Sequence, residues 1–332
     1  MKIVHFVLSD SFAGIEQHVD EVLTNFSSHK LILICNESIA SYFDKSINIY
    51  EIKNFGRRSF FGKYQLKKLI KDIDPDIIHT HGSKTSSIIS SIKTKNYKHV
   101  ATIHGVKKNK KIYEKADLII GVSDKALEGI NHETICINNW WHPKLKKIQN
   151  KKNKHALAVG RLEKVKGFDL LIASWKNIDA NLVIIGSGKE RNKLNELIEQ
   201  NNLSEKVKII DAVKKEELLN YYQDASVLII SSRDEGGPRV ALEALYLEIP
   251  VISTDVGHMS QILPKELLAE KNNQSALQDM LEKYVDNIHL YNQKAIFNFV
   301  EREFSIEEKM QELNDAYSLL ACLLYTSDAA DD

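Results

Sequence analysis

Short apolar runs alternate with segments of helical periodicity along this chain of 332 residues. Runs at residues 2–8, 76–80, 100–103 and 117–122 are bounded by polar or turn residues, which is typical of buried strands. Residues 15–26 instead place apolar side chains at positions 15, 19, 22, 23 and 26, which is the spacing of an amphipathic helix. The first part of the chain is therefore predicted to alternate strands with helices.

The second part of the chain repeats this alternation. Its predicted elements are strands at 155–159, 181–185 and 225–230 and helices at 168–175, 275–300 and 305–321. The last of these helices opens with Ser305-Ile-Glu-Glu308, which has the form of a capping box. Ser123 follows the strand at 117–122 and is predicted to cap a further helix.

Two domains are predicted from this arrangement. Regular alternation of strands and helices indicates an α/β fold with parallel sheets, and 332 residues are enough for two domains. Between Pro143 and Lys154 the chain is polar and lysine-rich without periodicity, so we expect the boundary there. The domains are therefore predicted at residues 1–148 and 154–300.

The composition is that of an ordinary globular protein, with 43% apolar and 27% charged residues. No apolar run approaches the roughly eighteen residues that suggest a membrane-spanning helix, and the chain opens with a strand in place of a secretory signal. Residues 322–332 resemble the translated read-through of a sequencing adapter and are not expected to be native. The remaining Cys35 and Cys136 give no disulfide framework, which favours a cytoplasmic location.

The formal charge is zero but unevenly distributed: residues 1–150 carry 23 Lys and Arg against 15 Asp and Glu, and residues 151–332 carry 22 against 30. Dense lysine runs occur at 107–111 and 144–147. Such runs are typical of a solvated surface or a linker, and they equally suit an anionic membrane, where each lysine contributes about 1 kcal/mol. Both interpretations stay open. No aromatic interleaving or binding motif indicates nucleic acid.

A glycine-rich turn joins the predicted strand at 225–230 to a helix. Its sequence, Glu235-Gly-Gly-Pro-Arg-Val-Ala-Leu-Glu243, contains two carboxylates eight positions apart. Pro238 suits the first helical position, which needs no amide donor. Free backbone N–H groups at such a helix start bind phosphate. Arg239 and Glu243 are also an i, i+4 pair, so Glu243 has a plain surface interpretation as well.

Two further loops follow predicted strands. In Gly160-Arg-Leu-Glu-Lys-Val-Lys-Gly167, Arg161 offers a planar fork and Lys166 a point charge, a combination that suits a diphosphate. Gly186-Ser-Gly188 forms a second glycine turn. Ligands of open α/β sheets bind at the carboxyl ends of strands, so these loops predict a ligand site.

Together these strings resemble the donor half of retaining, family-four-type glycosyltransferases with the GT-B fold. The matching pieces are GRLEKVKG (160–167), VIIGSG (183–188), DASVLIISS (224–232), EGGPRVALEAL (235–245) and PVISTDVG (250–257). The resemblance implies two Rossmann-like domains whose parallel sheets face a central cleft. It implies that Arg161 and Lys166 hold the diphosphate of a nucleotide sugar. It also implies that Glu243 binds the ribose hydroxyls and that Glu235 faces the donor sugar.

The remaining site residues are implied by the same resemblance. Backbone and side chains near the donor are expected at Gly14, Gly186, Gly236, Gly237, Pro238, Arg239 and Val240. The strings PDIIHTHG (75–82) and ADLIIGVS (116–123) resemble the acceptor half, and His104 would lie beside the transferred sugar. His79 and His81 are interpreted as strand-end histidines satisfied by backbone. By the same analogy, the helix at 305–321 would pack on the N-terminal domain.

The implied activity is transfer of a sugar from a nucleoside-diphosphate sugar to a glycan or lipid-linked acceptor, in cell-surface polysaccharide or lipopolysaccharide assembly. No cofactor or metal is expected, because Asp74-Pro75-Asp76 is a turn and no Cys/His set has zinc spacing. The expected partners are the donor, the acceptor and an anionic membrane surface on the cytoplasmic side. A nucleotide-sugar 2-epimerase and a non-catalytic ligand-binding protein of two domains remain alternatives.

Overall fold

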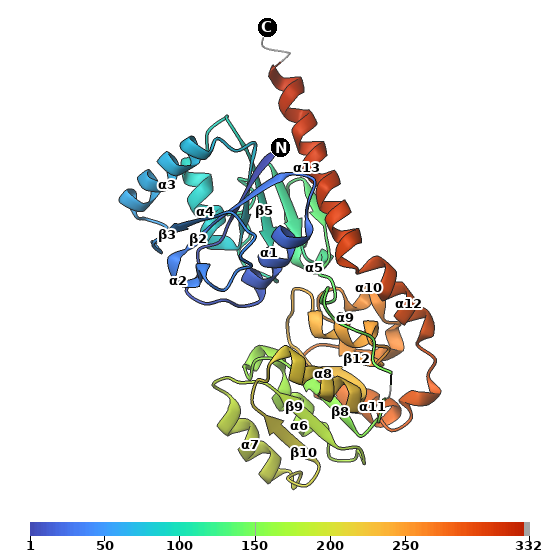
Figure 1. The fold of residues 1–332 in the computed structure, drawn as a ribbon. Helices are drawn as coiled ribbons and strands as arrows, with labels where there is room; N and C mark the ends of the chain where they lie inside the picture. Colours follow the sequence, from blue (N-terminus) through green and yellow to red (C-terminus); the bar gives the residue numbers. More distant parts are fainter. Residues whose placement is uncertain (150, 329–332) are drawn as a thin grey trace. The chain divides into compact units, whose positions relative to one another are not determined.

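The computed structural model describes residues 1–149 and 151–328, with side chains described as far as Ala321. The chain divides into two compact units. The first comprises Met1–Asn138 together with the chain from Glu307 onward, and the second comprises Asn139–Ile306. Each unit is a parallel sheet with helices packed on it (Figure 1). The predicted α/β class with parallel sheets is confirmed.

The first unit contains a seven-stranded sheet in the order β3-β2-β1-β4-β5-β6-β7. Its strands are β1 (Lys2–Phe6), β2 (Lys30–Asn36), β3 (Ile49–Ile52), β4 (Ile77–His81), β5 (Lys98–Ile103), β6 (Leu118–Gly121) and β7 (Thr134–Cys136). Its helices are α1 (Gly14–Asn25), α2 (Glu37–Ala40), α3 (Phe60–Ile73), α4 (Ser83–Ile92), α5 (Asp124–Leu127) and α13 (Ile306–Asp328). The predicted cap of α5 is confirmed, because the Ser123 side chain accepts a hydrogen bond from the Ala126 amide.

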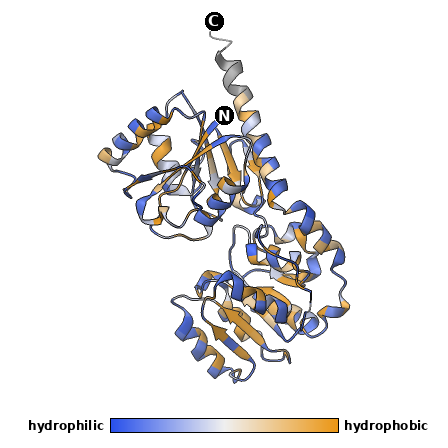
Figure 2. Cartoon of the chain, viewed as in Figure 1, coloured by the Kyte–Doolittle hydropathy of each residue, from blue (hydrophilic) through white to orange (hydrophobic). Residues whose placement is uncertain are grey.

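Helices cover both faces of this sheet, because side chains of a strand point alternately to either side. Strand β1 pairs with β2 and β4, and His5 lies opposite His79 in the register with β4. Val4 and Phe6 pack in the core beneath α3 and α4. On the other face, His5 lies within hydrogen-bond reach of Tyr317 from α13. Figure 2 shows apolar residues concentrated on the strands. The last described helix thus belongs to the first unit.

The second unit contains a six-stranded parallel sheet in the order β10-β9-β8-β11-β12-β13. Its strands are β8 (His155–Val159), β9 (Leu182–Ile185), β10 (Val207–Ile210), β11 (Ala225–Ile230), β12 (Val251–Thr254) and β13 (Leu268–Ala269). Its α-helices are α6 (Phe168–Ala173), α7 (Arg191–Gln200), α8 (Lys215–Asp224), α9 (Arg239–Tyr246), α10 (Met259–Ile262), α11 (Gln274–Tyr284) and α12 (Lys294–Glu303). Three 3-10 turns occur at η1 (Lys164–Lys166), η2 (Lys265–Leu267) and η3 (Ile288–Leu290).

The unit boundary lies earlier in the chain than the predicted linker at 143–154, because the residues after Asn138 already pack on the second unit. Trp140 is 1% exposed, and the ring of Trp141 stacks on Tyr246 with centroids 3.9 Å apart. Leu145 and Ile148 also contact the second core. The lysine-rich segment is therefore attached to the second unit along much of its length.

Two predicted helices need correction. The single helix predicted over 275–300 is two helices, α11 and α12. Helix α11 ends at its C-cap, Val285, and the turn η3 redirects the backbone before α12 begins. Gln293 is buried and its side chain accepts a hydrogen bond from the Val251 amide at 3.3 Å. The helix predicted over 305–321 runs on to Asp328, so the backbone of 322–328 is helical. Residues 329–332 of the suspected adapter segment lie outside the described residues.

No helix within the described ranges is both long and apolar enough to cross a membrane. The D-x-D string forms the predicted turn, in which Asp74 ends α3 with a φ of 51°. The Asp76 carboxylate accepts a hydrogen bond from the Lys2 amide at 2.6 Å and thereby fixes the start of β1. This string therefore has a structural role in the first unit.

Candidate active site

The loops that follow β8 and β11 are held together at the carboxyl edge of the second sheet. Ser231 Oγ donates to the Lys166 carbonyl at 3.0 Å, and the Arg233 amide donates to the Val165 carbonyl at 2.8 Å. Gly167 has a φ of +66°, and a Cβ atom there would lie 2.0 Å from the Ser231 carbonyl oxygen. Only glycine permits this approach. The predicted motifs at 160–167 and 235–243 therefore lie on loops that contact each other directly.

Lys166 and Glu235 form an ion pair between these loops. Their side chains are only 19% and 15% exposed, respectively, so the charges are largely withdrawn from solvent. Ser232 Oγ donates a second hydrogen bond to Glu235 Oε1 at 2.8 Å, which fixes the carboxylate. The aliphatic part of Lys166 passes over Gly160, where an added Cβ would lie 3.3 Å from it. The structure thus brings together two of the four predicted charged residues.

Arg161 lies on the same loop as Lys166, but its guanidinium pairs with Glu163 and not with Glu235. Its Nη1 atom donates to Glu163 Oε1 at 2.8 Å, and its side chain is 71% exposed. A paired grip with Lys166 would need the Arg161 side chain to change rotamer, which an exposed side chain can do on a picosecond to nanosecond timescale. The sequence placed Arg161 on the correct loop and did not predict its partner.

Glu243 lies on α9, where Tyr222 Oη donates to its Oε2 atom at 3.0 Å. Burial, and then the neighbouring Glu243 charge, raise the pKa of Tyr222 well above its ordinary value, so the hydroxyl stays a donor. Pro238 was predicted as the first helical residue but is the N-cap of α9. The helix begins at Arg239, which Val240 follows. Arg239 Nε donates to the Trp140 carbonyl at 3.3 Å.

The glycines of the predicted site allow close backbone contacts. A Cβ on Gly186 would lie 1.8 Å from the Gly160 carbonyl oxygen, so the loops after β8 and β9 also touch. A Cβ on Gly237 would lie 2.6 Å from His258 Nδ1. The Gly237 carbonyl accepts a hydrogen bond from Asn139 Nδ2 at 2.8 Å. The neighbouring Gly236 is buried beside the turn at Gly257, which has a φ of +54°.

Sequence reasoning missed a salt bridge that supports these loops. Arg233 Nη1 and Nη2 bind the two carboxylate oxygens of Asp169 at 2.6 and 2.7 Å. The same Nη1 donates to the Lys164 carbonyl at 2.8 Å. Burial opposes ionisation of Asp169, but the hydrogen bonds and charge of Arg233 dominate and lower its pKa. Neither residue has a sequence signal beyond its position next to a motif, since 64 residues separate them.

In the first unit, Gly14 is the first residue of α1 and has open space around the position of a Cβ. The preceding loop is fixed by Glu16, which is 3% exposed. Its carboxylate accepts hydrogen bonds from Ser9 Oγ at 2.6 Å and from the Ala13 amide at 2.9 Å. The open space at Gly14 is compatible with a ligand approaching the start of α1, which offers free N–H groups.

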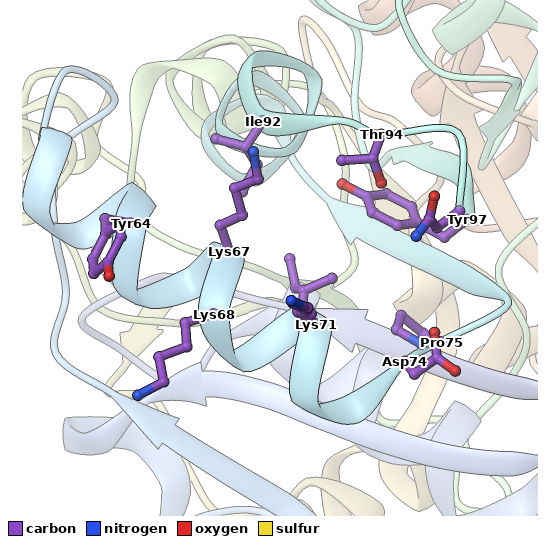
Figure 3. Close-up of a pocket in the computed structure, with 11 residues that line it drawn as sticks. Tyr64, Lys67, Lys68, Lys71, Asp74, Pro75, Ile92, Thr94 and Tyr97 are labelled. Atoms are coloured by element: carbon purple, nitrogen blue, oxygen red, sulfur yellow. The ribbon is translucent and has the colours of Figure 1, made fainter.

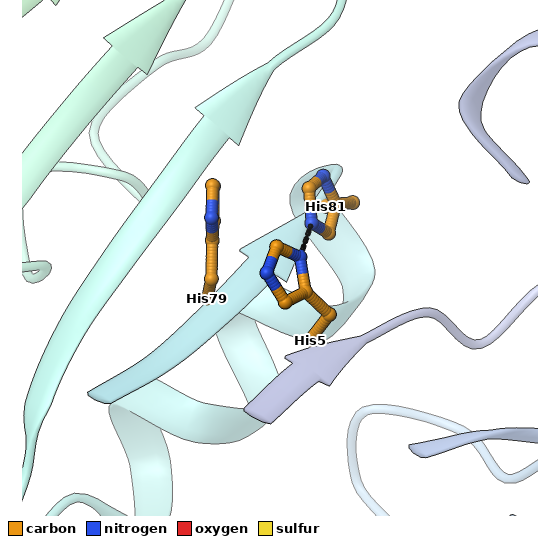
Figure 4. A group of neighbouring side chains, drawn as sticks. All are labelled: His5, His79 and His81. Carbon is orange, nitrogen blue, oxygen red and sulfur yellow. Dashed lines mark hydrogen bonds between the residues drawn. The ribbon is translucent and has the colours of Figure 1, made fainter. Parts of the chain in front are cut away.

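His104 follows β5 and is the first member of a hydrogen-bonded chain through the first unit. Its Nε2 atom lies 3.1 Å from His81 Nδ1, and His81 Nε2 lies 3.0 Å from His5 Nδ1 (Figure 4). His5 Nε2 lies 3.4 Å from Tyr317 Oη, which in turn lies 2.5 Å from His79 Nδ1. The chain ends where His79 Nε2 meets the hydroxyl of a β5 threonine, Thr102, at 2.6 Å.

These imidazoles are neutral near neutral pH. Burial lowers the pKa of His5 to about 3, and burial followed by repulsion from neighbouring histidines lowers the pKa of His79 and His81 well below its ordinary value. Burial, with a smaller contribution from Lys107, lowers the pKa of His104 to about 3. The prediction that His79 and His81 are satisfied by backbone is wrong, because their partners are side chains.

The same rings are close enough to hold a metal ion, since His5, His79 and His81 each offer a nitrogen within 4.8 Å of the others. A second set, His18, His81 and His104, meets the same criterion. However, the rings of His79 and His81 stack at 27° with centroids 4.4 Å apart, so their in-plane lone pairs do not converge well. Hydrogen bonds already engage both ring nitrogens of His5, His79 and His81 without an ion.

Solved structures share this architecture over nearly the whole chain. Alr3699/HepE from Anabaena, determined in complex with UDP-glucose, superposes with a TM-score of 0.80 at 14% sequence identity, covering 96% of this chain and 99% of that one. The fold is therefore the GT-B fold of glycosyltransferases. Two family models match along the sequence: "Glycosyltransferase Family 4" at residues 12–133 and "Glycosyl transferases group 1" at residues 143–295. The chain belongs to the family-4-type glycosyltransferases.

Two relatives show how far the sequence similarity extends. The uncharacterized glycosyltransferase MJ1178 of Methanocaldococcus jannaschii is 28% identical over 303 residues, which are 83% of this chain and 86% of the relative. The N-acetylgalactosamine-N,N'-diacetylbacillosaminyl-diphospho-undecaprenol 4-alpha-N-acetylgalactosaminyltransferase of Campylobacter jejuni is 27% identical over 262 residues. That match covers 72% of this chain and 70% of the relative. The prediction of a glycosyltransferase is confirmed.

Proposed function

We propose that this enzyme transfers a sugar from a nucleoside-diphosphate sugar to a hydroxyl of a glycan or lipid-linked acceptor, with retention of the anomeric configuration. The pathway is assembly of cell-surface polysaccharide or lipopolysaccharide. The Campylobacter relative supports a lipid-linked acceptor, because its name describes transfer onto a diphospho-undecaprenol-linked sugar. The UDP-glucose complex of HepE supports a nucleotide-sugar donor on this fold.

One observation carries the proposal: Lys166, on the loop after β8, pairs with Glu235, on the glycine turn that leads into α9. A cation, a carboxylate and the backbone amides of a helix start suit a sugar diphosphate, because each group has a matching partner on it. Diphosphate oxygens would replace Glu235 as the partner of Lys166. The released Glu235 carboxylate would then accept hydrogen bonds from hydroxyls of the sugar.

The reaction needs stabilisation of the leaving group more than a protein nucleophile. As the bond from the anomeric carbon to the phosphate oxygen breaks, negative charge grows on the diphosphate. Lys166, the exposed Arg161 and the amides at the start of α9 would stabilise that charge, which electrostatic groups do most effectively when they are preorganised. For retention, a departing phosphate oxygen takes the proton of the acceptor hydroxyl as that hydroxyl attacks the same face.

The remaining residues have binding roles in this proposal. Glu243, held by Tyr222, accepts hydrogen bonds from the ribose hydroxyls, and Gly186 lets the loops after β8 and β9 come together beside the donor. Gly14 admits the donor phosphate near the start of α1, and His104 orients the transferred sugar. No cofactor or metal takes part, and the enzyme works at an anionic membrane surface, where a lipid-linked acceptor resides.

Replacing Lys166 tests the proposal. We expect Lys166→Ala to lower the rate of transfer by at least about 100-fold, because loss of one preorganised group at a developing charge typically has that effect. Lys164→Ala is the matched control, since Lys164 lies two positions away on the same loop and is exposed. Release of nucleoside diphosphate from a panel of sugar donors, with acceptor present, gives the rate. Equal rates for wild type and Lys166→Ala would refute the assignment.

Two further measurements separate the alternatives. A thermal-shift screen of nucleoside diphosphates identifies the donor base, because a ligand at a hundred times its Kd stabilises the native state by about 2.7 kcal/mol. Incubation with the donor alone, followed by NMR of the sugar, would reveal an isomerised product if the chain were an epimerase. NMR of the glycosylated product reports the anomeric configuration, and inversion would contradict the retaining mechanism.

A further inference from the structure

Helix α3 of the first unit presents an aromatic surface to solvent. Phe60, Phe61 and Tyr64 are 92%, 71% and 70% exposed, respectively. Leu66 and Ile70 on the opposite side of the helix are buried against the sheet, so the exposed rings are not part of an unfinished core contact. Exposing three large rings on one helix turn costs free energy in water, which usually indicates a surface that contacts something apolar.

The same stretch of chain is strongly basic. Between Lys53 and Lys71 there are seven lysines and arginines and no aspartate or glutamate. On α3 itself, Lys67, Lys68 and Lys71 are exposed and follow Tyr64 at spacings of three, four and seven residues. These spacings place the ammonium groups on the same outward side of the helix as Tyr64. The outward side is therefore aromatic in its first turn and cationic in the next two.

A hollow of about 370 Å³ lies along this side of α3 (Figure 3). Lys67 and Lys71 line it together with apolar groups from Ile92 and Tyr97, and Asp74 lines it at the end of α3 (Figure 3). Lysine stems can lie along such apolar surface while their ammonium groups remain in water or reach an anion. The hollow thus extends the apolar surface beside the lysines, with one acid, Asp74, at its end.

We infer that the outward side of α3 is a docking surface for an anionic phospholipid bilayer. Aromatic rings favour the interface between headgroups and acyl chains, and lysines favour anionic headgroups. The surface has both features, and its lysines and arginines outnumber the two exposed acids at its far end, Asp72 and Asp74. This inference rests on the proposed function, because an enzyme acting on a lipid-linked acceptor must meet the acceptor at the bilayer.

The position of α3 in the fold suits this role. In a parallel α/β sheet, each helix begins at the edge where the preceding strand ends, so Phe60 and Phe61 lie near the carboxyl edge of the first sheet. Arg57 confirms this placement, since its Nη2 atom donates to Ser83 Oγ, at the start of α4, at 2.9 Å. His104 follows β5 at the same edge. The aromatic end of the docking surface therefore lies at the edge that carries the predicted acceptor-side residues.

Vesicle co-sedimentation of the full chain tests the inference. We expect binding to vesicles that contain phosphatidylglycerol and little binding to pure phosphatidylcholine vesicles. The variant Lys67→Glu, Lys68→Glu, Lys71→Glu should weaken partitioning by about 100-fold or more, because each lysine near such a surface contributes about a factor of five. The variant Phe60→Ser, Phe61→Ser, Tyr64→Ser should retain salt-sensitive binding and lose the part that persists at high salt.

Two control variants keep the test specific. Lys176→Glu, Lys193→Glu, Lys208→Glu makes the same charge change at exposed lysines of the second unit and should bind as wild type does. Lys107→Glu, Lys108→Glu, Lys111→Glu tests the competing lysine run. Wild-type binding by both α3 variants, or loss of binding only in the 107–111 variant, would overturn the inference. Absence of vesicle binding by the wild type would do so as well.

The vesicle-binding test is independent of the test of sugar transfer. The α3 variants should keep the wild-type thermal shift with nucleoside diphosphate, because their substitutions lie outside the second unit. An intact thermal shift with lost vesicle binding supports the docking surface. Failure of the donor assays in the wild type, with vesicle binding retained, would contradict the proposed function and leave the docking surface standing.

Discussion

At the scale of single residues, the chain combines charged contacts and neutral hydrogen bonds for different purposes. Lys166 and Glu235 form an ion pair, and the proposed function has each of them exchange the other for a group of the donor. The histidine chain from His104 to Thr102 is different, because its members are neutral, matched to one another and, apart from the half-buried His104, buried. Each neutral imidazole has one donor and one acceptor nitrogen, so fixing one tautomer along the chain fixes the next. His104 therefore receives its tautomer from the interior of the unit.

Tyr317 is the link in this chain that can be removed most cleanly. Tyr317→Phe deletes a hydroxyl that lies between His5 Nε2 and His79 Nδ1, and leaves the buried ring in place. Leaving buried nitrogens unpaired costs about 1–3 kcal/mol, so the free energy of unfolding of the first unit should fall by that amount. Chemical denaturation provides the measurement, and Tyr64→Phe, at an exposed ring, is the control that should change little.

A second readout separates positioning from stability. If the hydrogen-bonded chain sets the tautomer of His104, the ¹⁵N shifts of its ring nitrogens should differ between wild type and Tyr317→Phe. Unchanged shifts in a destabilised variant would mean that Tyr317 supports packing alone. Unchanged stability as well would contradict the hydrogen-bond network.

At the scale of elements, strands that are buried on both faces could be predicted well. The strands predicted at 155–159 and 225–230 coincide with β8 and β11, because a short continuous apolar run between turns has few other structures available. Helix ends were harder to predict. Residues 275–300 have helical composition throughout, and only tertiary contacts such as that of Gln293 with Val251 reveal the break.

In the candidate site too, some features could be predicted from the sequence and others could not. Glycine spacing predicted the loops that hold Lys166 and Glu235, since close backbone approach leaves a mark in the sequence at Gly167 and Gly186. Contacts between side chains far apart in sequence, such as Arg233 with Asp169, leave no comparable mark. The histidine chain was missed because histidine alternation on a strand is equally compatible with backbone partners.

The strands β1, β4 and β5 should make the first unit sensitive to acid. Burial lowers the pKa of His5, His79, His81 and His99 below the unfolded value of about 6.5, with His99 at about 4. The unfolded chain therefore binds protons that the native unit does not bind. Stability is fully present above about pH 6.5 and is lost as the pH falls, by about 1.4 kcal/mol per pH unit for each histidine.

Hydrogen exchange at pH 7 and pH 5 measures this loss element by element, after correction for the intrinsic exchange rates. Amides of β1, β4 and β5 should lose more protection than those of β8 and β11. The second unit is an internal control, although burial also lowers the pKa of its own His155. Equal loss of protection in both units would show that the histidine cluster does not govern the acid response.

At the scale of the whole molecule, the chain order and the units do not coincide. The chain builds the first unit as far as Asn138, builds the second unit, and then returns α13 to the first. The returning helix buries its apolar side in the first unit, and Tyr317 completes the histidine chain there. Stability of the first unit therefore depends on residues that follow the whole second unit along the chain.

Truncation provides the test of this dependence. A chain ending at Ser305 would lack six buried apolar side chains of α13, which are Ile306 of the second unit and Met310, Leu313, Ala316, Tyr317 and Leu320 of the first. Each large apolar side chain contributes about 1.5–3 kcal/mol when buried, and a typical domain has a net stability of about 5–15 kcal/mol. The first unit should therefore lose its native exchange protection, whereas the second unit, whose core lies within 139–306, should keep its protection.

A chain ending at Ala321 retains all six side chains and is expected to behave as the full chain does. Full protection of β1 and β4 in the shorter chain would show that the first unit is stable without α13.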